Sequence, residues 1–395
     1  MLITSGRVLV GSGTYLADGA VLIEGDTITA VGPRIQIEEQ VGADVPRCAF
    51  DGTVMPGLID SHVHLAFDGG PDPVSTLQES TDEVLFEDMR RRAEQLLNSG
   101  VTTARDLGDR GGLALRLAAE INDGATPGPR IVAAGTPVTT VGGHCHFLGG
   151  EVSGGAEARE LVRRNLTAGA GVIKVMVTGG GLTKDGPKSH QSQFSAEELT
   201  AVVDEAHKAG VPVAAHAHGA DGIAAAVEAG VDTIEHCTWL SSGGLDFRRD
   251  VVNQIVAQGI TVCPAVSPHW QMLPRVFGEE RANAMFDLVR QMADAGVRLV
   301  AGTDAGVQRT GFDGLVPALS FYTHLGLDNA SIIDMATSEA AKALGLGSVT
   351  GRIAPGYRAD LLLVDGDPLT DLGALKNPMA VFASGMRFEP GATAE

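Results

Sequence analysis

The stretch KAGVPVAAHAHG (208–219) combines three signals that recur along this chain. It starts with the end of a helical pattern, turns at Gly210, and continues into a short apolar run of valine and alanine. A glycine at this place is typical of the left-handed residue that ends a helix, and the apolar run after it is typical of a buried parallel strand. The stretch therefore predicts a helix followed by a strand, with two histidines at the end of the strand.

The same pattern occurs five more times, at residues 98–109, 168–177, 228–237, 257–266 and 294–306. Two further strand candidates, 54–65 and 128–135, lack the preceding helix. Strands that alternate with helices in this way predict the α/β class, and eight of them predict a (β/α)8 TIM barrel. An open doubly wound sheet is the structural alternative, but its nucleotide-binding form has little support because no GxGxxG follows the first strand.

The two ends of the chain have a different pattern. Residues 2–10 and 19–32 alternate apolar and polar side chains around turn signals, and 351–371 and 378–390 are similar in character. This alternation indicates antiparallel strands. Because neither end has enough apolar residues for a core of its own, we expect both to form one small β-sandwich. The predicted domains are 1–54 with 347–395 for the sandwich, and 55–346 for the barrel.

Composition restricts the possible partners. The 395 residues carry a formal net charge of -20, which argues against nucleic-acid binding because phosphates are bound by clustered lysine and arginine. No apolar run approaches membrane length, and the four cysteines have no CxxC spacing. We expect a cytoplasmic homo-oligomer that acts on a small molecule and has no nucleic-acid or membrane partner.

Histidines and one aspartate stand at the ends of several predicted strands: His62 and His64 in DSHVHL (60–65), then His216, His218, His236 and Asp304. Two residues that are two positions apart on a strand face the same side. Each residue alone has an ordinary explanation, such as a core histidine or a helix cap. Together they would meet where the strands of a barrel end, and imidazole with carboxylate suits a divalent transition metal.

Lys174 lies inside the predicted strand of GVIKVMVTGGG (171–181) and faces the same side as Val172 and Met176. If this side is the barrel interior, the amine lies among the predicted ligands and should be neutral or modified, because an ammonium would repel metal ions. A Schiff-base aldolase also uses a strand lysine in a barrel, but it would leave the histidines and Asp304 without a role.

This order of residues resembles the amidohydrolase superfamily, as do VMPGLIDSHVH (54–64) and GRIAPGYRADLLLVDGDP (351–368). Five other segments are similar to its prolidase-like, imidazolonepropionase-related group, which includes Xaa-Pro dipeptidases. They are GVTTARDLGD (100–109), VGGHCHFLGGE (141–151), VIKVMVTGGGLT (172–183), QFSAEELTAVVDEAHKAG (193–210) and IEHC (234–237). The resemblance implies two divalent metal ions, with zinc as the default from the ligand types. It also implies the ligands, which are His62, His64, Lys174, His216, His236 and Asp304. Lys174 would carry a CO2-derived carbamate that bridges the two metals.

The resemblance further implies a metal-dependent hydrolase that cleaves a C–N bond through a metal-bridging hydroxide. Asp304 would accept the proton of the attacking water and pass it to the leaving nitrogen. His144, in VGGHCHFLGG (141–150), would bind substrate or stabilise the oxyanion. We expect an Xaa-Pro dipeptide or an N-acyl amino acid as substrate.

Other readings of the site stay open at this point. A carbamate, lactone or cyclic-amide hydrolase, or a deaminase, could use the same scaffold, although a one-metal site would lack the bridging lysine. A non-catalytic relative should have lost ligands, and every ligand position is filled here. His218 replaces the tyrosine of some relatives and is a candidate substrate contact, as is His190 in the loop 183–193. His269 and Arg309 are candidates by location alone.

Overall fold

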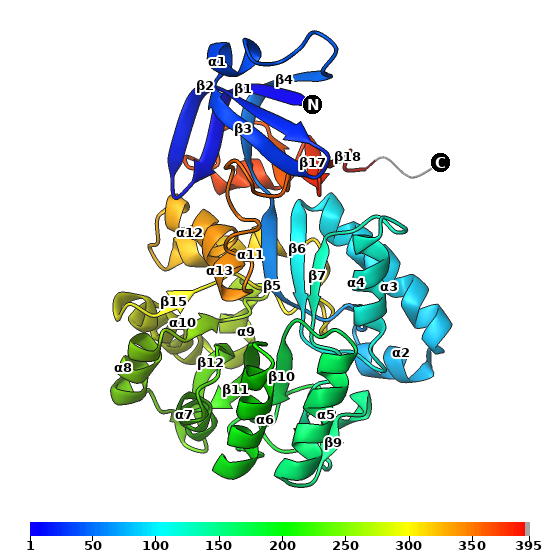
Figure 1. Cartoon of the computed structure of the whole chain (residues 1–395). Coiled ribbons are helices and arrows are strands. Elements are labelled where there is room, and N and C mark those ends of the chain that lie inside the picture. The colour runs from blue at the N-terminus through cyan, green and yellow to red at the C-terminus, as the bar shows by residue number, and fades with distance from the viewer. Residues whose placement is uncertain (392–395) are drawn as a thin grey trace.

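The computed structural model describes residues 1–391 and confirms the α/β class (Figure 1). A sheet built from the two ends of the chain lies at one side of the molecule. A larger region of parallel strands and surrounding helices lies at the other. The chain passes from one to the other where β4 (Arg47–Pro56) continues, after the single residue Gly57, into β5 (Leu58–Val63).

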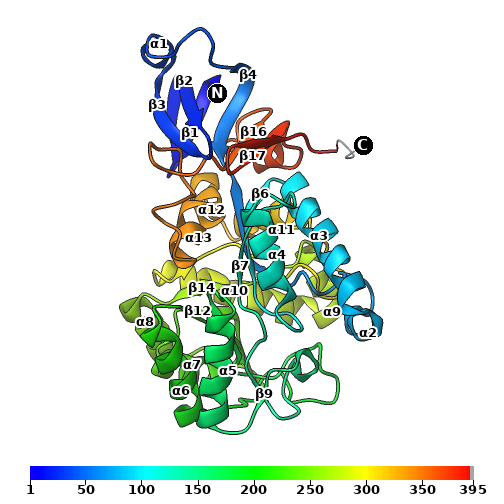
Figure 2. The ribbon, with the colours of Figure 1, turned by 45° about the vertical axis from the view of Figure 1, so that its right-hand side comes forward.

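The terminal sheet has seven strands in the order β18-β17-β16-β4-β1-β2-β3. Its other members are β1 (Leu2–Gly11), β2 (Thr14–Glu24), β3 (Thr27–Pro33), β16 (Leu361–Val364), β17 (Ala380–Ala383) and β18 (Met386–Phe388), with α1 (Arg34–Glu38) after β3. Apolar side chains from both ends, including Ile3, Val54 and Phe382, form one buried cluster. Figures 1 and 2 both show the two ends of the chain side by side, and their strands belong to one sheet.

All eight strand candidates of the central region form parallel strands. One sheet holds β5, β6 (Val101–Asp106) and β7 (Arg130–Ala133). The other holds β10 (Ile173–Met176), β11 (Val213–Gly219), β12 (Thr233–Ser241), β14 (Thr261–Cys263) and β15 (Arg298–Leu299), with the short β13 (Gly244–Leu245) beside β12. A separate pair, β8 (Thr139–Thr140) and β9 (Glu151–Val152), follows β7.

Backbone hydrogen bonds join the two parallel sheets at both edges. Next to β7 and β10, the N–H of Gly171 donates to the carbonyl of Ala133 at 3.0 Å. Next to β15 and β5, the N–H of Ser61 donates to the carbonyl of Ala301 at 3.0 Å. The first and last strands of this region are therefore neighbours, although more than two hundred residues of sequence separate them.

Helices pack around these strands (Figure 2). They are α2 (Pro73–Glu79), α3 (Asp82–Asn98), α4 (Leu113–Asn122), α5 (Gly155–Thr167), α6 (Ala196–Lys208), α7 (Ala220–Ala229), α8 (Arg249–Gln258), α9 (Leu273–Phe277), α10 (Glu279–Asp294), α11 (Leu315–His324), α12 (Asn329–Met335) and α13 (Ser338–Ala343), besides three short 3-10 turns at 146–148, 270–272 and 372–375. Among the described residues, none of these helices combines the length and apolar character needed to cross a membrane.

Local sequence explains where α6 begins and ends. Ser195 accepts a hydrogen bond from the N–H of Glu198, whose side chain accepts from the N–H of Ser195 in return. Leu199 and Val202 lie on the buried face of the helix. After the helix, Gly210 has a φ of +71°, the left-handed conformation that its glycine predicts.

Candidate metal centre

A cavity of about 270 Å³ lies where the parallel strands end. Five histidines, Lys174 and Asp304 provide most of its polar lining, and the histidines are His64, His144, His216, His218 and His236. His62 lies beside it, with its ring centroid 5.3 Å from that of His64. All the predicted metal ligands thus lie in or next to a single cavity.

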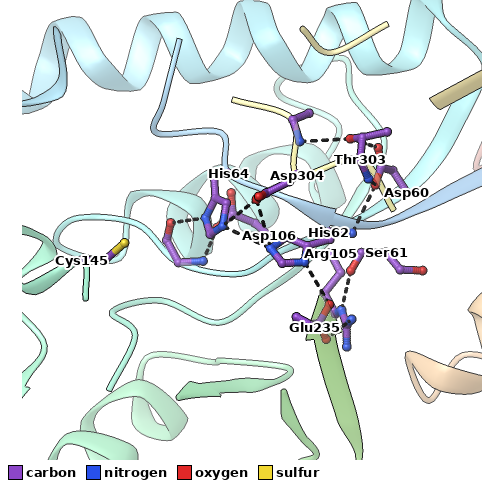
Figure 3. Close-up of polar contacts among 12 residues, drawn as sticks. Asp60, Ser61, His62, His64, Arg105, Asp106, Cys145, Glu235, Thr303 and Asp304 are labelled. Carbon is purple, nitrogen blue, oxygen red and sulfur yellow. Dashed lines mark hydrogen bonds and ion pairs between the residues drawn. The ribbon is translucent and has the colours of Figure 1, made fainter. Parts of the chain in front are cut away.

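Among the predicted ligands at this cavity, His62, His64 and Asp304 form one group of closely spaced side chains (Figure 3). Oδ1 of Asp304 lies 3.2 Å from Nε2 of His62 and 3.5 Å from Nε2 of His64. The two Nε2 atoms are 3.3 Å apart. The N–H of Asp304 donates to the carbonyl of His62 at 2.8 Å, so the backbone places this carboxylate directly beside the two rings.

A second group consists of His216, His218 and His236, each of which has a ring nitrogen within 4.8 Å of the others. The His236 ring lies 4.7 Å from that of His216 and 4.4 Å from that of His218 between centroids. His236 also forms a group of the same size with His62 and Asp304. The two groups are therefore continuous, with His236 between them.

Hydrogen bonds determine which nitrogen of three of these rings carries a hydrogen. His62 Nδ1 lies 2.9 Å from the Glu235 carboxylate, His64 Nδ1 3.2 Å from the Gly108 carbonyl, and His216 Nε2 3.1 Å from the Gly179 carbonyl. Because these oxygens only accept, the ring nitrogens facing them carry the hydrogen. The opposite nitrogens of His64 and His216 keep their lone pairs, which is how metal-binding histidines are usually oriented. Nε2 of His62 instead faces the Asp304 carboxylate.

Lys174 is 1% exposed, and its Nζ has no hydrogen-bond partner among the described residues. Burial lowers the pKa of this amine because it penalises the charged form. An unpaired buried polar atom is costly, so a polar or charged group in the cavity would relieve it. Histidine nitrogens, a carboxylate and this amine are donors that fit divalent metal ions.

The protonation states of the histidines and of Asp304 bear on whether these side chains can bind a metal ion. Burial lowers the pKa of His64 and of His144 to about 3 and that of His218 to about 4. For Asp304, burial acts in the opposite direction, but the neighbouring His62 and His64 outweigh it and lower the pKa of the carboxyl. At neutral pH His64, His144 and His218 are therefore neutral imidazoles and Asp304 is a carboxylate. For His62, burial acts to lower the pKa, but Asp304 and Glu235 outweigh it and raise the pKa.

Two of the predicted ligands have a strained backbone. His236 has a φ of +68° and Asp304 a φ of +60°, in the left-handed region that residues other than glycine rarely adopt. Such strain persists only where the surrounding structure imposes it, and it is concentrated at functional sites. The strain here supports a functional role for His236, which lies within β12, and for Asp304, which lies in the segment after β15.

The profile of the Amidohydrolase family matches residues 53–386, which is most of the chain. This chain belongs to the amidohydrolase family. It is an enzyme of the predicted kind, a metal-dependent amidohydrolase.

Individual relatives align over nearly the whole chain. The ochratoxinase of Aspergillus niger is 28% identical and covers 96% of this chain and 84% of its own length. The imidazolonepropionase of Paracoccus denitrificans is 26% identical and covers 90% of each chain. The crystal structure of an Xaa-Pro dipeptidase with methionine bound in its active site is 30% identical with a TM-score of 0.85. It covers 98% of this chain and 99% of its own.

The remaining candidates of this amidohydrolase lie in different places. His144 and His218 line the cavity, and Nδ1 of His218 lies 2.9 Å from the Thr238 hydroxyl. His190 lies outside the cavity lining, where its backbone packs against Gly219. His269 and Arg309 are exposed and also lie outside the lining.

Sequence reasoning missed three buried charged residues beside the ligands: Asp60, Arg105 and Glu235. Each lies in an apolar strand, so the signal that drew attention to Lys174 was present for them too. Burial raises the pKa of Glu235, but Arg105 and His62 outweigh it and hold the pKa at about 2. Glu235 is therefore a buried carboxylate in contact with a predicted metal ligand.

Proposed function

We propose that this amidohydrolase cleaves the amide bond of an N-acyl amino acid or an Xaa-Pro dipeptide with two divalent metal ions, zinc by ligand type. The observation that carries the proposal is the buried Nζ of Lys174, which has no hydrogen-bond partner in the part of the chain that the structure describes and lies in the same cavity as the histidines and Asp304. As a neutral amine it can attack CO2 and lose a proton, and the resulting carbamate is an anion that two metals can share.

The proposed ligands are His62, His64, Lys174, His216, His236 and Asp304. Bound there, two metal ions would make a water acidic enough to attack at neutral pH and would polarise the substrate carbonyl. Asp304 accepts the proton of the attacking water, whose oxygen bonds to the carbonyl carbon. Asp304 then delivers that proton to the nitrogen as the C–N bond breaks. Its position beside His62 and His64 supports this role.

We assign His144 to the stabilisation of the negative oxygen that forms in this step. Its Nδ1 lies 3.3 Å from Oγ1 of Thr183, and that oxygen also accepts the N–H of Cys145 at 2.8 Å. The Thr183 hydroxyl is thus free to donate to Nδ1, which leaves the hydrogen of His144 on Nε2 as a donor. His218 is the second proposed substrate contact and His190 the third.

The shape of the site supports a substrate with two parts. The inner cavity shares Gly181, Leu182 and Gln308 with a neighbouring cavity of about 480 Å³ that Val74 and Phe147 also line. One part of an amide substrate would lie beside the metals and the other in the outer cavity. The name of the Xaa-Pro dipeptidase, with methionine bound in its active site, supports amides of amino acids in particular.

We also propose the finer architecture that the sequence predicts. The hydrogen bonds at both edges of the two parallel sheets support one closed (β/α)8 barrel over 55–346. The shared apolar cluster of the terminal strands supports a small β-sandwich of 1–54 with 347–395. We propose that the enzyme works in the cytoplasm as a homo-oligomer on a small molecule, without a nucleic-acid or membrane partner.

The test is a substrate screen on enzyme loaded with zinc, manganese or cobalt. The panel contains N-acyl amino acids, Xaa-Pro dipeptides, carbamates and lactones, each with and without chelator. We expect release of free amino acid, loss of turnover in chelator, and recovery when metal is added back. Turnover limited to lactones, or full turnover in the absence of metal, would contradict the proposal.

A further inference from the structure

A buried ion pair lies beside the cavity and outside the predicted ligand set. Arg105, on β6, and Glu235, on β12, are 1% and 0% exposed, and Nη2 of Arg105 lies 2.7 Å from Oε1 of Glu235 (Figure 3). The second carboxylate oxygen, Oε2, lies 2.9 Å from Nδ1 of His62 on β5. Three strands thus contribute to a single chain of contacts that ends on a metal ligand.

Every other polar atom of this pair also has a partner. Nε of Arg105 donates to the carbonyl of Ser61 at 2.7 Å, and its Nη1 donates to Oγ1 of Thr233 at 2.9 Å. The Thr233 hydroxyl donates to Oε1 of Glu235 at 2.8 Å. With Oε1 held from two sides, Glu235 is fixed in one orientation and its Oε2 is aimed at the His62 ring.

Two charges in the interior of a protein are costly to desolvate, and apolar side chains of similar volume often stabilise a fold as well or better. Stability alone therefore gives little reason for this pair. The contact with His62 gives another reason, because an ionised carboxylate accepts stronger hydrogen bonds than a neutral group and fixes the tautomer of the ring that donates to it.

We propose that Glu235, held by Arg105, is a positioning residue that sets the metal affinity of the site through His62. The carboxylate accepts the hydrogen on Nδ1 of His62 and orients the ring so that Nε2 faces Asp304 and the cavity. This inference rests on the proposed metal site and adds a determinant of its affinity.

A direct role for Glu235 as a metal ligand has less support. His62, Glu235 and Cys263 have potential ligand atoms within 4.8 Å of one another, which would be enough for a metal ion. The guanidinium of Arg105 already occupies one side of the Glu235 carboxylate, and a metal cation there would be repelled by it. The carboxylate therefore acts on the metal site from behind His62.

The first test uses Glu235→Gln, which keeps the shape of the side chain and removes its charge. Metal content and the dissociation constant for Zn²⁺ are measured by competition with a chromophoric chelator, together with the thermal unfolding of the metal-free protein. We expect Zn²⁺ to bind about 10- to 100-fold more weakly. Asp360→Asn is the matched control, because Asp360 is a buried carboxylate of the terminal sheet that accepts from the N–H of Ser384.

The double variant Arg105→Met/Glu235→Gln separates positioning from structural support. The single variant leaves the Arg105 cation buried without its partner, so its metal-free Tm should fall, whereas the double variant removes both charges and should regain that Tm. We expect the Zn²⁺ affinity of the double variant to stay low. Recovery of affinity together with Tm would overturn the proposal, and the double variant decides the matter if the single variant does not fold.

The same measurements distinguish this proposal from the proposed function. Wild-type affinity for Zn²⁺ in Glu235→Gln would overturn the positioning role and leave the metal site intact. Failure of the wild-type protein itself to bind Zn²⁺ would overturn both. A loss of affinity in Asp360→Asn as large as in Glu235→Gln would also overturn the positioning role, since it would show a general effect of removing a buried charge.

Discussion

Asp60 and Thr303 are joined by two hydrogen bonds in the interior of the protein. The N–H of Thr303 donates to Oδ1 of Asp60 at 3.1 Å, and its hydroxyl donates to Oδ2 at 2.7 Å. Oδ1 also accepts the N–H of His62 at 3.2 Å. Since Thr303 directly precedes Asp304, this clasp sets the position of the Asp304 carboxylate, the proposed proton acceptor, relative to His62 (Figure 3).

The clasp predicts an effect of Thr303→Val, which keeps the shape of the side chain and removes its hydroxyl. Oδ2 of Asp60 and the N–H of Ala305, which donates to the Thr303 hydroxyl at 3.0 Å, would both lose a partner. We expect the free energy of unfolding to fall by about 1–3 kcal/mol, measured with denaturant, and turnover to fall with it. Thr303→Ser keeps the hydroxyl and should lie close to wild type. Equal losses in the two variants would contradict the role of the hydroxyl.

Lys174→Ala tests the bridging lysine. Removal of a ligand shared by two metals should reduce the bound metal from about two ions per chain and abolish turnover. Metal analysis after gel filtration and initial rates measure both effects. Lys184→Ala, at an exposed lysine outside the inner cavity, is the control and should keep the full metal content. A Lys174→Ala enzyme with full metal and full rate would refute the bridge.

Gly180→Ala tests the position of His144 without changing a metal ligand. A Cβ at Gly180 would overlap the His144 ring, whereas a Cβ at Gly181 would meet no atom within 4 Å. We expect Gly180→Ala to lower kcat/KM about 10- to 100-fold at unchanged metal content, because small displacements of a catalytic group are costly. Gly181→Ala should have the smaller effect. The assignment of His144 fails if the two variants have the same kcat/KM.

The buried carboxyl of Asp109 predicts how the free energy of unfolding changes with pH, and Asp109→Asn tests this. Burial raises the pKa of Asp109 to about 6, even though its carboxylate accepts the N–H groups of Gly112 and Ala114. The ordinary value is about 4, so between about pH 4 and pH 6 the folded protein binds more protons than the unfolded chain and loses stability as pH rises. The variant should lose less stability over this interval, because Asp109 no longer contributes while the buried Asp60 and Asp106 still do.

Denaturant unfolding from about pH 2.5 to pH 7 measures that slope and also covers the range of the control. The slope is the readout, because the amide also costs a hydrogen bond at every pH. Asp328→Asn is a control of opposite sign, since hydrogen bonds from Ser331 lower the pKa of Asp328. Its wild-type carboxylate adds stability that is lost as pH falls below about 4. An unchanged slope in Asp109→Asn would contradict the prediction.

Local patterns in the sequence were enough to predict the elements of the fold. The capping box of Ser195 and Glu198 and the stop at Gly210 are formed by residues within a few positions of one another, so the start and end of α6 could be read directly. The strands could be predicted in the same way, because a glycine followed by an apolar run marks where such a strand begins. Placing His216 and Asp304 at one site then needed only the rule that parallel strands end on the same side.

The contacts that tune the site could not be predicted in this way. Glu235 meets His62 across 173 positions of sequence, and Asp60 meets Thr303 across 243. In the sequence, Glu235 is one charged residue in the strand TIEHC, with no sign of which ring it faces. The inner cavity, which Leu182 and Gln308 help to line, is likewise formed by loops that come together only in the folded chain.

The sequence alone therefore determined the α/β class, the eight parallel strands, the pairing of the two ends and the set of side chains at the strand ends. These follow from periodicity and from short-range chemistry along the chain. Only the tertiary structure decided which ring nitrogens of His62, His64 and His216 carry hydrogen, which buried charges lie behind the proposed ligands, and that Nζ of Lys174 has no hydrogen-bond partner within residues 1–391. These properties depend on atoms brought within about 3 Å of one another by packing, and no local pattern encodes such distances.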